Sequence, residues 1–254
     1  MINVHKVSKR FNGTNAVNEV SFEVQEGETL ILLGTSGCGK TTTLRMINRL
    51  TEPSSGAISI DGKSILTLNP ETLRRSIGYV LQGNGLFPHY TVAENIAIVP
   101  KLLNWDKLKI LHRTQELLDK FALPYKEFAG AYPSELSGGQ QQRVGLARAL
   151  AANPPVLLMD EPFGALDPIT RSDVRKEFKE LDELKKRTIV MVTHDVQEAI
   201  ELGSRICLMD KGRIMQIGTK TDLMLQPANE VVTKFFNHYR NAVADAYRQL
   251  PANN

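Results

Sequence analysis

The sequence has few cysteines, no long hydrophobic run and no excess of charge of one sign. Its two cysteines, Cys38 and Cys207, stand in neither a CxxC pair nor a Cys/His pattern with metal-ligand spacing. This argues against a zinc site and a disulfide framework, and it suits a reducing cytosol. The 31 basic and 28 acidic side chains give a formal net charge of +3. This near-equal number of basic and acidic side chains does not suggest a nucleic-acid-binding surface.

Segments that would enter a membrane are also missing from the sequence. The first ten residues lack the apolar region of a secretory signal peptide. No stretch approaches the ~18–20 consecutive apolar residues of a transmembrane helix. With 42% hydrophobic and 23% charged residues, the chain has the composition of a globular domain with a sizeable core. We therefore expect any membrane role to be exercised through a partner.

Short apolar runs alternate with helical spacing along the chain. Strands are predicted over Ile2–Lys6, Val20–Val24, Thr29–Leu33, Ala57–Ile60, Val156–Met159, Thr188–Thr193 and Arg205–Met209. Lys40–Leu50 is predicted to be a helix, and helical spacing dominates between Thr91 and Leu150. Another helix is expected from about Glu230. This order predicts an α/β fold with a mainly parallel sheet covered on both faces, and a helical segment inserted between its two halves.

A glycine-rich segment joins the predicted strand Thr29–Leu33 to the helix that begins at Lys40. Its sequence, GTSGCGKT over Gly34–Thr41, fits the P-loop pattern G-x-x-x-x-G-K-[ST] between a strand and a helix. Glycines let backbone N–H groups point inward as an anion nest, and the helix N-terminus adds its positive dipole end. Lys40 would approach the β- and γ-phosphates, and Thr41 would offer a hydroxyl to Mg²⁺. The alternative is a glycine-rich turn that only caps a helix.

The P-loop prediction names a set of phosphate-contacting residues. They are Gly34, Thr35, Ser36, Gly37, Cys38, Gly39, Lys40, Thr41 and Thr42. Among them, Cys38 stands at a helix N-terminus, a position that favours the thiolate. The plainer interpretation is that Cys38 is a small residue that fits the loop.

A pair of acids follows the predicted strand Val156–Met159. Asp160 and Glu161 would therefore lie at the carboxyl edge of the sheet, where open α/β sheets bind ligands. Asp160 could hold Mg²⁺, and Glu161 could act as the general base that activates water. The alternative for such a pair is a strand end with solvated acids or a helix cap.

The pentapeptide LSGGQ, Leu136–Gln140, is followed by Gln141–Arg143 and a predicted helix, Val144–Ala152. Together with the P-loop and the acidic pair, it resembles the signature sequence of ABC ATPases. The resemblance implies ATP and Mg²⁺ as cofactors. It implies a P-loop NTPase (RecA-like) fold with an N-terminal antiparallel β subdomain and an inserted α-helical subdomain. The expected ABC ATPase domain covers residues 1–237, with the helical subdomain at about 88–155 and a short helical or frayed tail at 238–254.

Four further residues take roles from this resemblance. Gln82 matches the Q-loop glutamine that meets Mg²⁺ and the attacking water, and Asp167 in Ala165-Leu166-Asp167 matches the D-loop. His194, after the predicted strand Thr188–Thr193, matches the switch histidine near the γ-phosphate. Phe11 stands where the family has an aromatic ring that stacks on adenine. Taken singly, a histidine after a strand or a phenylalanine near the N-terminus is more often structural, and a glutamine in a loop usually has no functional meaning. The order of these residues around LSGGQ favours the functional roles of Gln82 and His194.

The signature also predicts a second anion-binding helix start. Ser137, Gly138, Gly139 and Gln140 begin a helix whose N–H groups could bind phosphate. The resemblance implies a head-to-tail homodimer in which each ATP lies between Lys40 of one copy and Ser137 of the other. Such an isologous interface would contain two equal sites.

Several stretches resemble ATPases of osmoprotectant importers, which take up glycine betaine, carnitine, choline or similar quaternary amines. These stretches are Arg45–Leu50, Leu73–Tyr79, Gly85–His89, Glu94–Ala97 and Asp160–Thr170. Importers of amino acids or of another small polar solute are the alternative. The chain departs from the pattern at Gly83-Asn84. Many of those relatives carry appended CBS domains, and because this sequence ends at Asn254 we do not expect regulation of that kind.

The resemblance implies partners and a location. The chain would bind transmembrane permease subunits at the cytoplasmic face of the cell membrane and meet a solute-binding protein indirectly. Phe87, Pro88 and Tyr90 could line a groove for a permease helix, although Phe87 could equally be core. A DNA-repair ABC enzyme would carry a long coiled-coil insertion, and a translation-type factor would carry two cassettes. A nucleotide-gated binding module without hydrolysis is disfavoured by Glu161 and His194.

Overall fold

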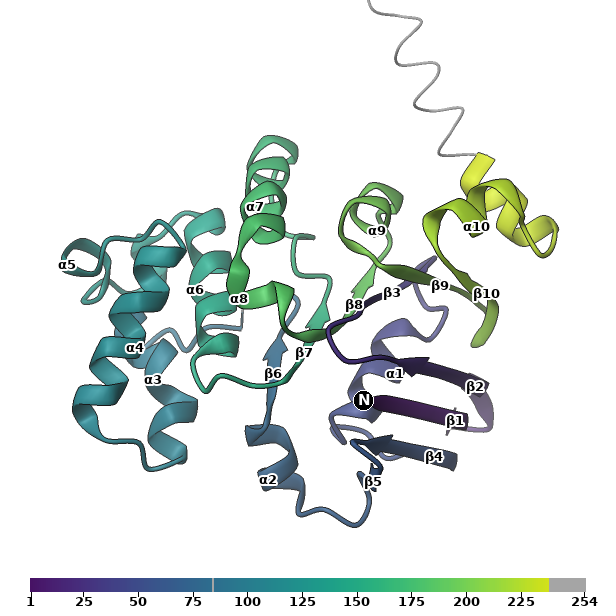
Figure 1. Cartoon of the computed structure of the whole chain (residues 1–254), viewed down its shortest axis with the longest axis horizontal. Coiled ribbons are helices and arrows are strands. Elements are labelled where there is room, and N and C mark those ends of the chain that lie inside the picture. The colour runs from purple at the N-terminus through teal and green to yellow at the C-terminus, as the bar shows by residue number, and fades with distance from the viewer. Residues whose placement is uncertain (84, 238–254) are drawn as a thin grey trace, which may run out of the picture.

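The computed structural model describes residues 1–83 and 85–237 of the 254-residue chain. Figure 1 shows two sheets and a group of helices around them. Asn84 and the predicted tail at 238–254 lie outside the described residues.

Six strands form the central sheet. They are β3 (Thr29–Gly34), β6 (Ile77–Val80), β7 (Val156–Asp160), β8 (Thr188–Thr193), β9 (Arg205–Asp210) and β10 (Arg213–Gly218). Their order is β10-β9-β3-β8-β7-β6. All neighbours pair in parallel except β9 and β10. The carboxyl ends of β3, β8, β7 and β6 therefore meet along one edge.

The central strands are mainly apolar because both faces of the sheet are covered. Every residue of β7 and β8 is buried. Alternate side chains enter two different cores: Ile31 and Leu33 pack with residues of α6 and α7, whereas Leu30 and Leu32 pack with residues of α1 and the second sheet. Because successive side chains of a strand point to opposite faces of the sheet, β3 contributes to the cores on both sides.

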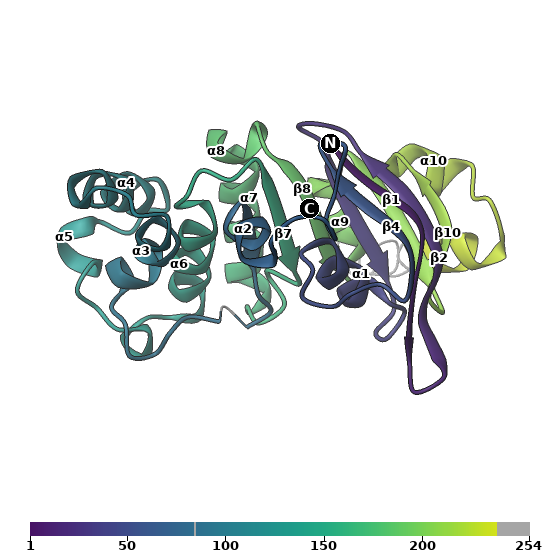
Figure 2. The same ribbon diagram turned by 90° about the horizontal axis from the view of Figure 1, so that it is seen from below.

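The second sheet is antiparallel and lies at the opposite end of the molecule from α3–α5 (Figure 2). Its strands are β1 (Ile2–Phe11), β2 (Thr14–Val24), β4 (Ser55–Ile60) and β5 (Lys63–Ser64), in the order β2-β1-β4-β5. The inner side chains Val4, Val7, Val17 and Val20 are buried against the face of the central sheet that carries α1. The hairpin of β1 and β2 is thereby brought to the start of α1.

A helical layer connects β6 to β7. It consists of α3 (Val92–Leu102), α4 (Lys107–Lys120), α5 (Tyr125–Phe128), a short 3₁₀ turn (Pro133–Glu135) and α6 (Gly138–Leu150). Thr91 and Glu94 close a capping box at the start of α3. The layer is thus inserted between β6 and β7 in the sequence, while the two strands still pair directly in the sheet.

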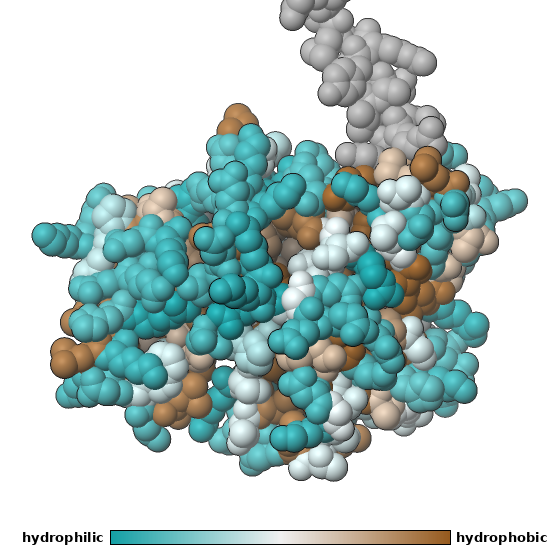
Figure 3. All heavy atoms as spheres, in the orientation of Figure 1, coloured by the Kyte–Doolittle hydropathy of each residue, from teal (hydrophilic) through white to brown (hydrophobic). Residues whose placement is uncertain are grey.

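The remaining helices cover the sheet or extend from it. They are α1 (Lys40–Ile47), α2 (Pro70–Arg75), α7 (Pro168–Glu180), α8 (Asp182–Lys185), α9 (Val196–Leu202) and α10 (Lys220–Leu225). Residues 230–237 are also helical. Among residues 1–83 and 85–237, no helix is both long and apolar enough to cross a membrane. Over the face in Figure 3, hydrophilic side chains predominate and hydrophobic ones are scattered.

The α/β fold class predicted from the sequence is confirmed, with its antiparallel subdomain and inserted helices. All seven predicted strands are present, some of them longer than expected: β1 continues to Phe11 and β2 begins at Thr14. The predicted helix 40–50 ends earlier, at Ile47. The pattern did not reveal β5 and β6, which have only two and four residues, or β10, whose side chains are mostly half-buried.

Candidate active site

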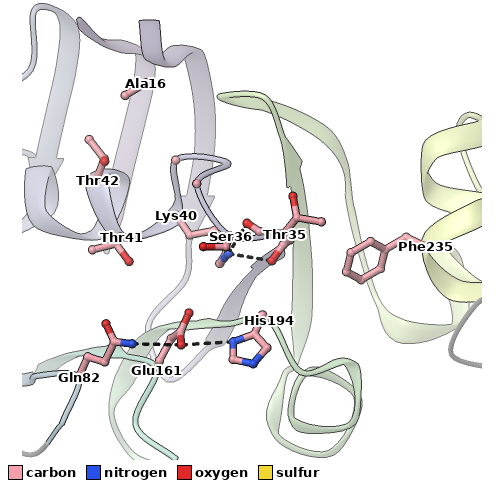
Figure 4. Close-up of a pocket in the computed structure, with 13 residues that line it drawn as sticks. Ala16, Thr35, Ser36, Lys40, Thr41, Thr42, Gln82, Glu161, His194 and Phe235 are labelled. Atoms are coloured by element: carbon pink, nitrogen blue, oxygen red, sulfur yellow. Dashed lines mark hydrogen bonds and ion pairs between the residues drawn. The ribbon is translucent and has the colours of Figure 1, made fainter. Parts of the chain in front are cut away.

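A cavity of about 600 Å³ opens at the carboxyl edge of the central sheet. Figure 4 shows its residues converging from β3, α1 and the ends of β6, β7 and β8. They are Ala16, Gly34, Thr35, Ser36, Gly37, Gly39, Lys40, Thr41, Thr42, Gln82, Glu161, His194 and Phe235. Most of the residues predicted from the P-loop pattern are therefore brought together with Gln82, Glu161 and His194.

The loop between β3 and α1 needs glycine for two physical reasons. Gly39 has φ +103°, and a Cβ there would lie 2.6 Å from the carbonyl oxygen of Ala16. A Cβ on Gly34 would lie 2.3 Å from the carbonyl oxygen of Met209. Any side chain at these two positions would displace backbone. The glycines therefore let the loop lie close to β2 and β9 and curl around the start of α1.

Lys40 is held across the loop at the N-terminus of α1. Its Nζ donates to the carbonyl oxygens of Gly34 at 2.7 Å and Thr35 at 2.8 Å. The side chain is only 4% exposed, so its charge lies in a region that water screens weakly. Together with the helix dipole, this places concentrated positive potential at the cavity wall, as an anion-binding site requires.

Cys38 points away from the cavity, although it belongs to the loop. Its side chain is 3% exposed and packs in the core beneath the loop. Burial raises the pKa of the thiol, and Lys40 opposes this rise only in part. The expectation that the helix N-terminus favours the thiolate was therefore wrong, because desolvation outweighs it. Cys38 contributes to the loop through its backbone and its small size.

Asp160 and Thr41 meet below the cavity. The Thr41 hydroxyl donates to Asp160 Oδ1 at 2.7 Å, which links the end of β7 to the first turn of α1. Asp160 is 2% exposed. Burial raises the pKa of its carboxyl group, and the hydrogen bond from Thr41 works in the opposite direction. A buried carboxylate beside a hydroxyl is a pair of hard oxygen donors of the kind that Mg²⁺ prefers.

Glu161 turns its carboxylate into the cavity through an unusual backbone conformation. Its φ is +45°, and its N–H donates to the carbonyl oxygen of Val192 at 3.0 Å. Positive φ in a residue other than glycine costs energy and persists where neighbouring contacts impose it. The bond to β8 therefore fixes the direction of the side chain.

Three side chains from three strands meet at that carboxylate. Glu161 Oε2 lies 3.2 Å from His194 Nδ1 and 3.4 Å from Gln82 Nε2. Figure 4 shows the two contacts on either side of the glutamate, facing the P-loop. The group combines a potential base with two side chains that could orient a water molecule beside the phosphate loop.

The predicted signature residues lie apart from this cavity. Ser137 caps α6: its Oγ accepts from Gln140 N at 3.3 Å, and Gln140 Oε1 accepts from Ser137 N at 2.8 Å. Asp167 likewise caps α7 by accepting from the N–H groups of Ile169 and Thr170 at 3.1 Å. Neither group lines the cavity of its own chain, and their roles in ATP binding stay predictions.

Phe11 also lies outside the cavity lining. Its ring is 49% exposed, with Lys9 Nζ 5.1 Å from the ring centroid. Two residues that the sequence analysis missed do line the cavity, Ala16 and Phe235. Ala16 carries no chemical group to notice, and Phe235 belongs to no motif and is separated from the P-loop by two hundred residues. The stacking role of Phe11 stays a prediction.

Comparison with known proteins places this geometry in a family. The chain is 52% identical over 241 residues to the glycine betaine/carnitine/choline transport ATP-binding protein OpuCA of Bacillus subtilis strain 168, covering 94% of this chain and 63% of OpuCA. It is 50% identical over 236 residues to the glycine betaine uptake system ATP-binding protein YehX of Escherichia coli K12, covering 93% of this chain and 76% of YehX. The chain thus spans less than two thirds of the length of OpuCA.

A solved structure agrees with the fold. The dimeric post-hydrolysis state of the ATP-binding cassette MJ0796, bound to ADP and Pi, superimposes with a TM-score of 0.75 at 35% identity, covering 86% of this chain and 98% of that cassette. The family model described as ABC transporter matches residues 17–164. That range begins beside Ala16 and includes the P-loop, LSGGQ and the acidic pair. Because it covers more than half of the 254 residues, this protein belongs to the ABC transporter family.

Proposed function

We propose that the chain is an ATP-binding and ATP-hydrolysing subunit that energises an importer of osmoprotectant quaternary amines such as glycine betaine, carnitine or choline. The observation that carries the ATPase proposal is the convergence of Lys40, Gln82, Glu161 and His194 on one cavity. The solute class is supported by the transport names of OpuCA and YehX, each at least 50% identical to this chain.

ATP would bind with its phosphates on the loop that precedes α1. Backbone N–H groups of Gly37, Gly39 and Lys40 would face the phosphate oxygens, and the α1 dipole would add to their attraction. Lys40 Nζ, which now lies 2.7 Å from the Gly34 carbonyl oxygen, would add a donor to the terminal phosphates. The cavity of about 600 Å³ has room for a triphosphate.

Mg²⁺ would be held by Thr41, Asp160 and Gln82. Among the described residues no group of three or more His, Cys, Asp or Glu side chains could hold a metal by itself. This agrees with the usual habit of Mg²⁺, which binds one or two protein carboxylates and completes its shell with phosphates and water. The Thr41–Asp160 contact of 2.7 Å supplies two oxygen donors, and the bound ion would neutralise charge on the phosphates.

Hydrolysis would begin with a water molecule placed between Glu161 and the γ-phosphate. Glu161 would accept a proton from this water as its oxygen bonds to the γ-phosphorus, while the bond from that phosphorus to the bridging oxygen of ADP breaks. His194 and Gln82, both in contact with Glu161 Oε2, would orient the carboxylate and the water. ADP and inorganic phosphate are then released.

A second copy of the chain would complete each site. Within one chain the α6 N-terminus, capped by Ser137, does not line the cavity, so its anion-binding potential is available to another molecule. A head-to-tail pair would place Ser137 and Gly138 of one copy over the ATP on Lys40 of the other. The dimeric MJ0796 cassette, at 35% identity, supports this arrangement. ATP would hold the pair closed, and hydrolysis would release it.

Permease subunits would bind at a groove near Gln82. Phe87 and Tyr90 are 51% and 46% exposed, with ring centroids 5.6 Å apart. Phe87 is therefore not core. It borders a groove of about 330 Å³ with Leu50, Leu81 and Val99, which suits the apolar side of a short helix. Through these contacts the chain would work at the cytoplasmic face of the membrane.

Glu161→Gln tests the ATPase proposal. Loss of the base should lower phosphate release by roughly 10²- to 10⁴-fold, while ATP still binds and the closed dimer accumulates. Phosphate release at high protein concentration and light scattering after size exclusion would measure both effects. Glu180→Gln, an exposed change on α7, is the matched control. Normal turnover by Glu161→Gln would refute the assigned base.

A further inference from the structure

A buried hydrogen bond closes the turn that carries His194. Thr193, the last residue of β8, donates its hydroxyl proton to Glu198 Oε2 at 2.6 Å. The same hydroxyl oxygen accepts from Asp195 N–H at 3.0 Å. Thr193 and Glu198 are 2% and 3% exposed. The two residues on either side of His194 are thus tied to one hydroxyl group, which donates its hydrogen bond to Glu198.

The turn is fixed from the helix side as well. Asp195 caps α9, and its Oδ1 accepts from Gln197 N at 2.7 Å and Glu198 N at 3.3 Å. None of these bonds uses the side chain of His194, which is 58% exposed and lies with Nδ1 3.2 Å from Glu161 Oε2. The network therefore holds the backbone of the turn and leaves the imidazole directed at the cavity.

Glu198 is an unusual residue to bury in this position. Burial raises the pKa of its carboxyl group, and the hydrogen bond from Thr193 opposes the rise. The charged groups that face it are Asp195 on its own element and Arg171 and Arg175 on α7. Arg171 Nη1 lies 3.7 Å from Asp195 Oδ2, and Arg175 Nε lies 3.5 Å from Glu201 Oε2. An apolar side chain would fill this space without the cost of desolvating a carboxylate.

We propose that Glu198 is a positioning residue, which accepts a hydrogen bond from the Thr193 hydroxyl group and thereby fixes the turn that presents His194 to Glu161. A threonine hydroxyl has a single proton and two lone pairs. When the O–H bond points at Glu198, a lone pair of the same oxygen is directed at Asp195 N–H. Without that acceptor the hydroxyl can rotate, the Asp195 bond weakens, and the backbone on both sides of His194 gains freedom. This inference rests on the proposed ATPase function.

Two substitutions should produce the same defect. Glu198→Ala removes the acceptor and Thr193→Val removes the donor. We expect each to lower kcat for ATP hydrolysis roughly 10- to 100-fold, since a displacement near 1 Å is costly for an aligned reaction. KM for ATP should stay within about twofold, because the P-loop is untouched. The double variant should be no worse than either single variant, since both remove one interaction.

Conservative and control variants separate positioning from general stability. Glu198→Gln keeps an acceptor oxygen and should restore most of kcat. Glu201→Ala removes a carboxylate one turn further along α9, which contacts Arg175 and accepts from Gln197 Nε2. It makes no bond to Thr193, His194 or Asp195, so its kcat should match that of the wild type. Full additivity of Glu198→Ala and Thr193→Val, or equal loss in Glu201→Ala, would overturn the proposal.

A second measurement does not depend on turnover. The His194 imidazole signal can be assigned by NMR from its loss in His194→Gln, and followed in the full chain without nucleotide. We expect it to shift in Glu198→Ala and Thr193→Val, and to stay in place in Glu201→Ala. An unshifted signal in both variants would reject the positioning role. If the wild type fails to hydrolyse ATP while these shifts occur, the proposed function fails and the positioning role stands.

Discussion

Two glycine-rich helix starts in this chain share local chemistry and differ in surroundings. α1 begins after Gly39, which offers no side-chain cap, at the carboxyl edge of the central sheet. α6 begins after Ser137 in a capping box. The Ser137 hydroxyl oxygen accepts from the backbone N–H of Gln140, and the Gln140 side-chain oxygen accepts from the backbone N–H of Ser137. The first start faces Gln82, Glu161 and His194 across a cavity, and the second faces none of them.

The difference shows why only one of these two anion-binding helix N-termini can form a reaction site. Both starts offer N–H groups and a dipole. Only α1 stands where the ends of β6, β7 and β8 deliver side chains to one point, because β8, β7 and β6 follow β3 in that order across the sheet. A helix start without such neighbours can bind phosphate and cannot activate water. We therefore expect the α6 start to act only in combination with a second copy.

The largest expected effect separates the two starts by substitution. Lys40→Ala removes the ammonium beside the phosphates and should weaken ATP binding roughly 10- to 100-fold, as expected for loss of charge-assisted hydrogen bonds. Gly138→Asp should bind ATP normally and lose nearly all turnover, because its carboxylate would repel the γ-phosphate held by the other copy. Calorimetric titration with ATP and phosphate release would measure the two quantities.

Gly138→Asp is suited to this test because the fold should tolerate it. A Cβ on Gly138 would meet only Leu166 Cδ2, at 3.8 Å, and an acid in the first turn of a helix is favourable. Lys63→Ala, an exposed change on β5, serves as the control for Lys40→Ala. Loss of ATP binding in Gly138→Asp would contradict the separation of the two starts.

Mixing the two inactive variants sharpens the comparison further. In a mixed dimer, one site would combine Lys40 of the Gly138→Asp copy with Gly138 of the Lys40→Ala copy and would be complete. Random pairing makes half of the dimers mixed, each with one complete site, so turnover should recover to roughly a quarter of the wild-type value. The assay is phosphate release against mixing ratio. A mixture as inactive as its components would rule out sites shared between copies.

A smaller effect concerns how the helical layer that carries α6 is attached. Glu183 of α8 contacts Arg113 and Lys120 of α4 at 3.2 Å and 2.7 Å. Hydrogen bonding from Arg113, with that from Lys120, lowers the pKa of Glu183 from 4.5 to about 2 despite partial burial. Because the pKa is depressed on folding, this stabilisation is present above about pH 4.5 and is lost as the pH falls toward 2.

Glu183→Gln should therefore lower the free energy of unfolding at pH 7 by about 1–2 kcal/mol. Its Tm should approach that of the wild type as the pH falls below about 4.5. Thermal unfolding followed by circular dichroism at several pH values would show both trends. ATP binding on Lys40 should not change. Glu127→Gln, exposed on α5, is the control, and a Tm difference that does not depend on pH would contradict the assignment.

The smallest effect compares Phe11, which lies outside the cavity lining, with Phe235, which belongs to it. If adenine stacks on Phe11 as the family resemblance implies, Phe11→Ala should weaken ATP binding about fivefold, since an aromatic stack contributes about 1 kcal/mol. Phe235 lines the cavity without belonging to any motif, and Phe235→Ala should change affinity less than twofold. Titration with ATP and with inorganic triphosphate, which has no base, would separate stacking from phosphate binding. A larger effect of Phe235→Ala would exchange the two assignments.

Much of the site could be predicted because its requirements are local. A backbone that curls around an anion needs glycines at fixed spacing before a lysine. A capping box is formed by a serine with a glutamine three residues after it. Gly34–Thr41 and Leu136–Gln140 therefore show their conformation in the sequence itself. An apolar run of β7 that ends in Asp160 and Glu161 likewise predicts acids at a sheet edge.

By itself, then, the sequence determined the fold class, the two glycine-rich helix starts and the acidic pair. The tertiary structure decided which side chains meet. Glu161 contacts Gln82 and His194, which are 79 residues before it and 33 after it, because β6, β7 and β8 are neighbours. The tertiary structure also buries Cys38 in the core, places Phe235 at the cavity and pairs Thr193 with Glu198. The physical reason is that strand order and burial depend on the packing of the whole chain, which no local pattern encodes.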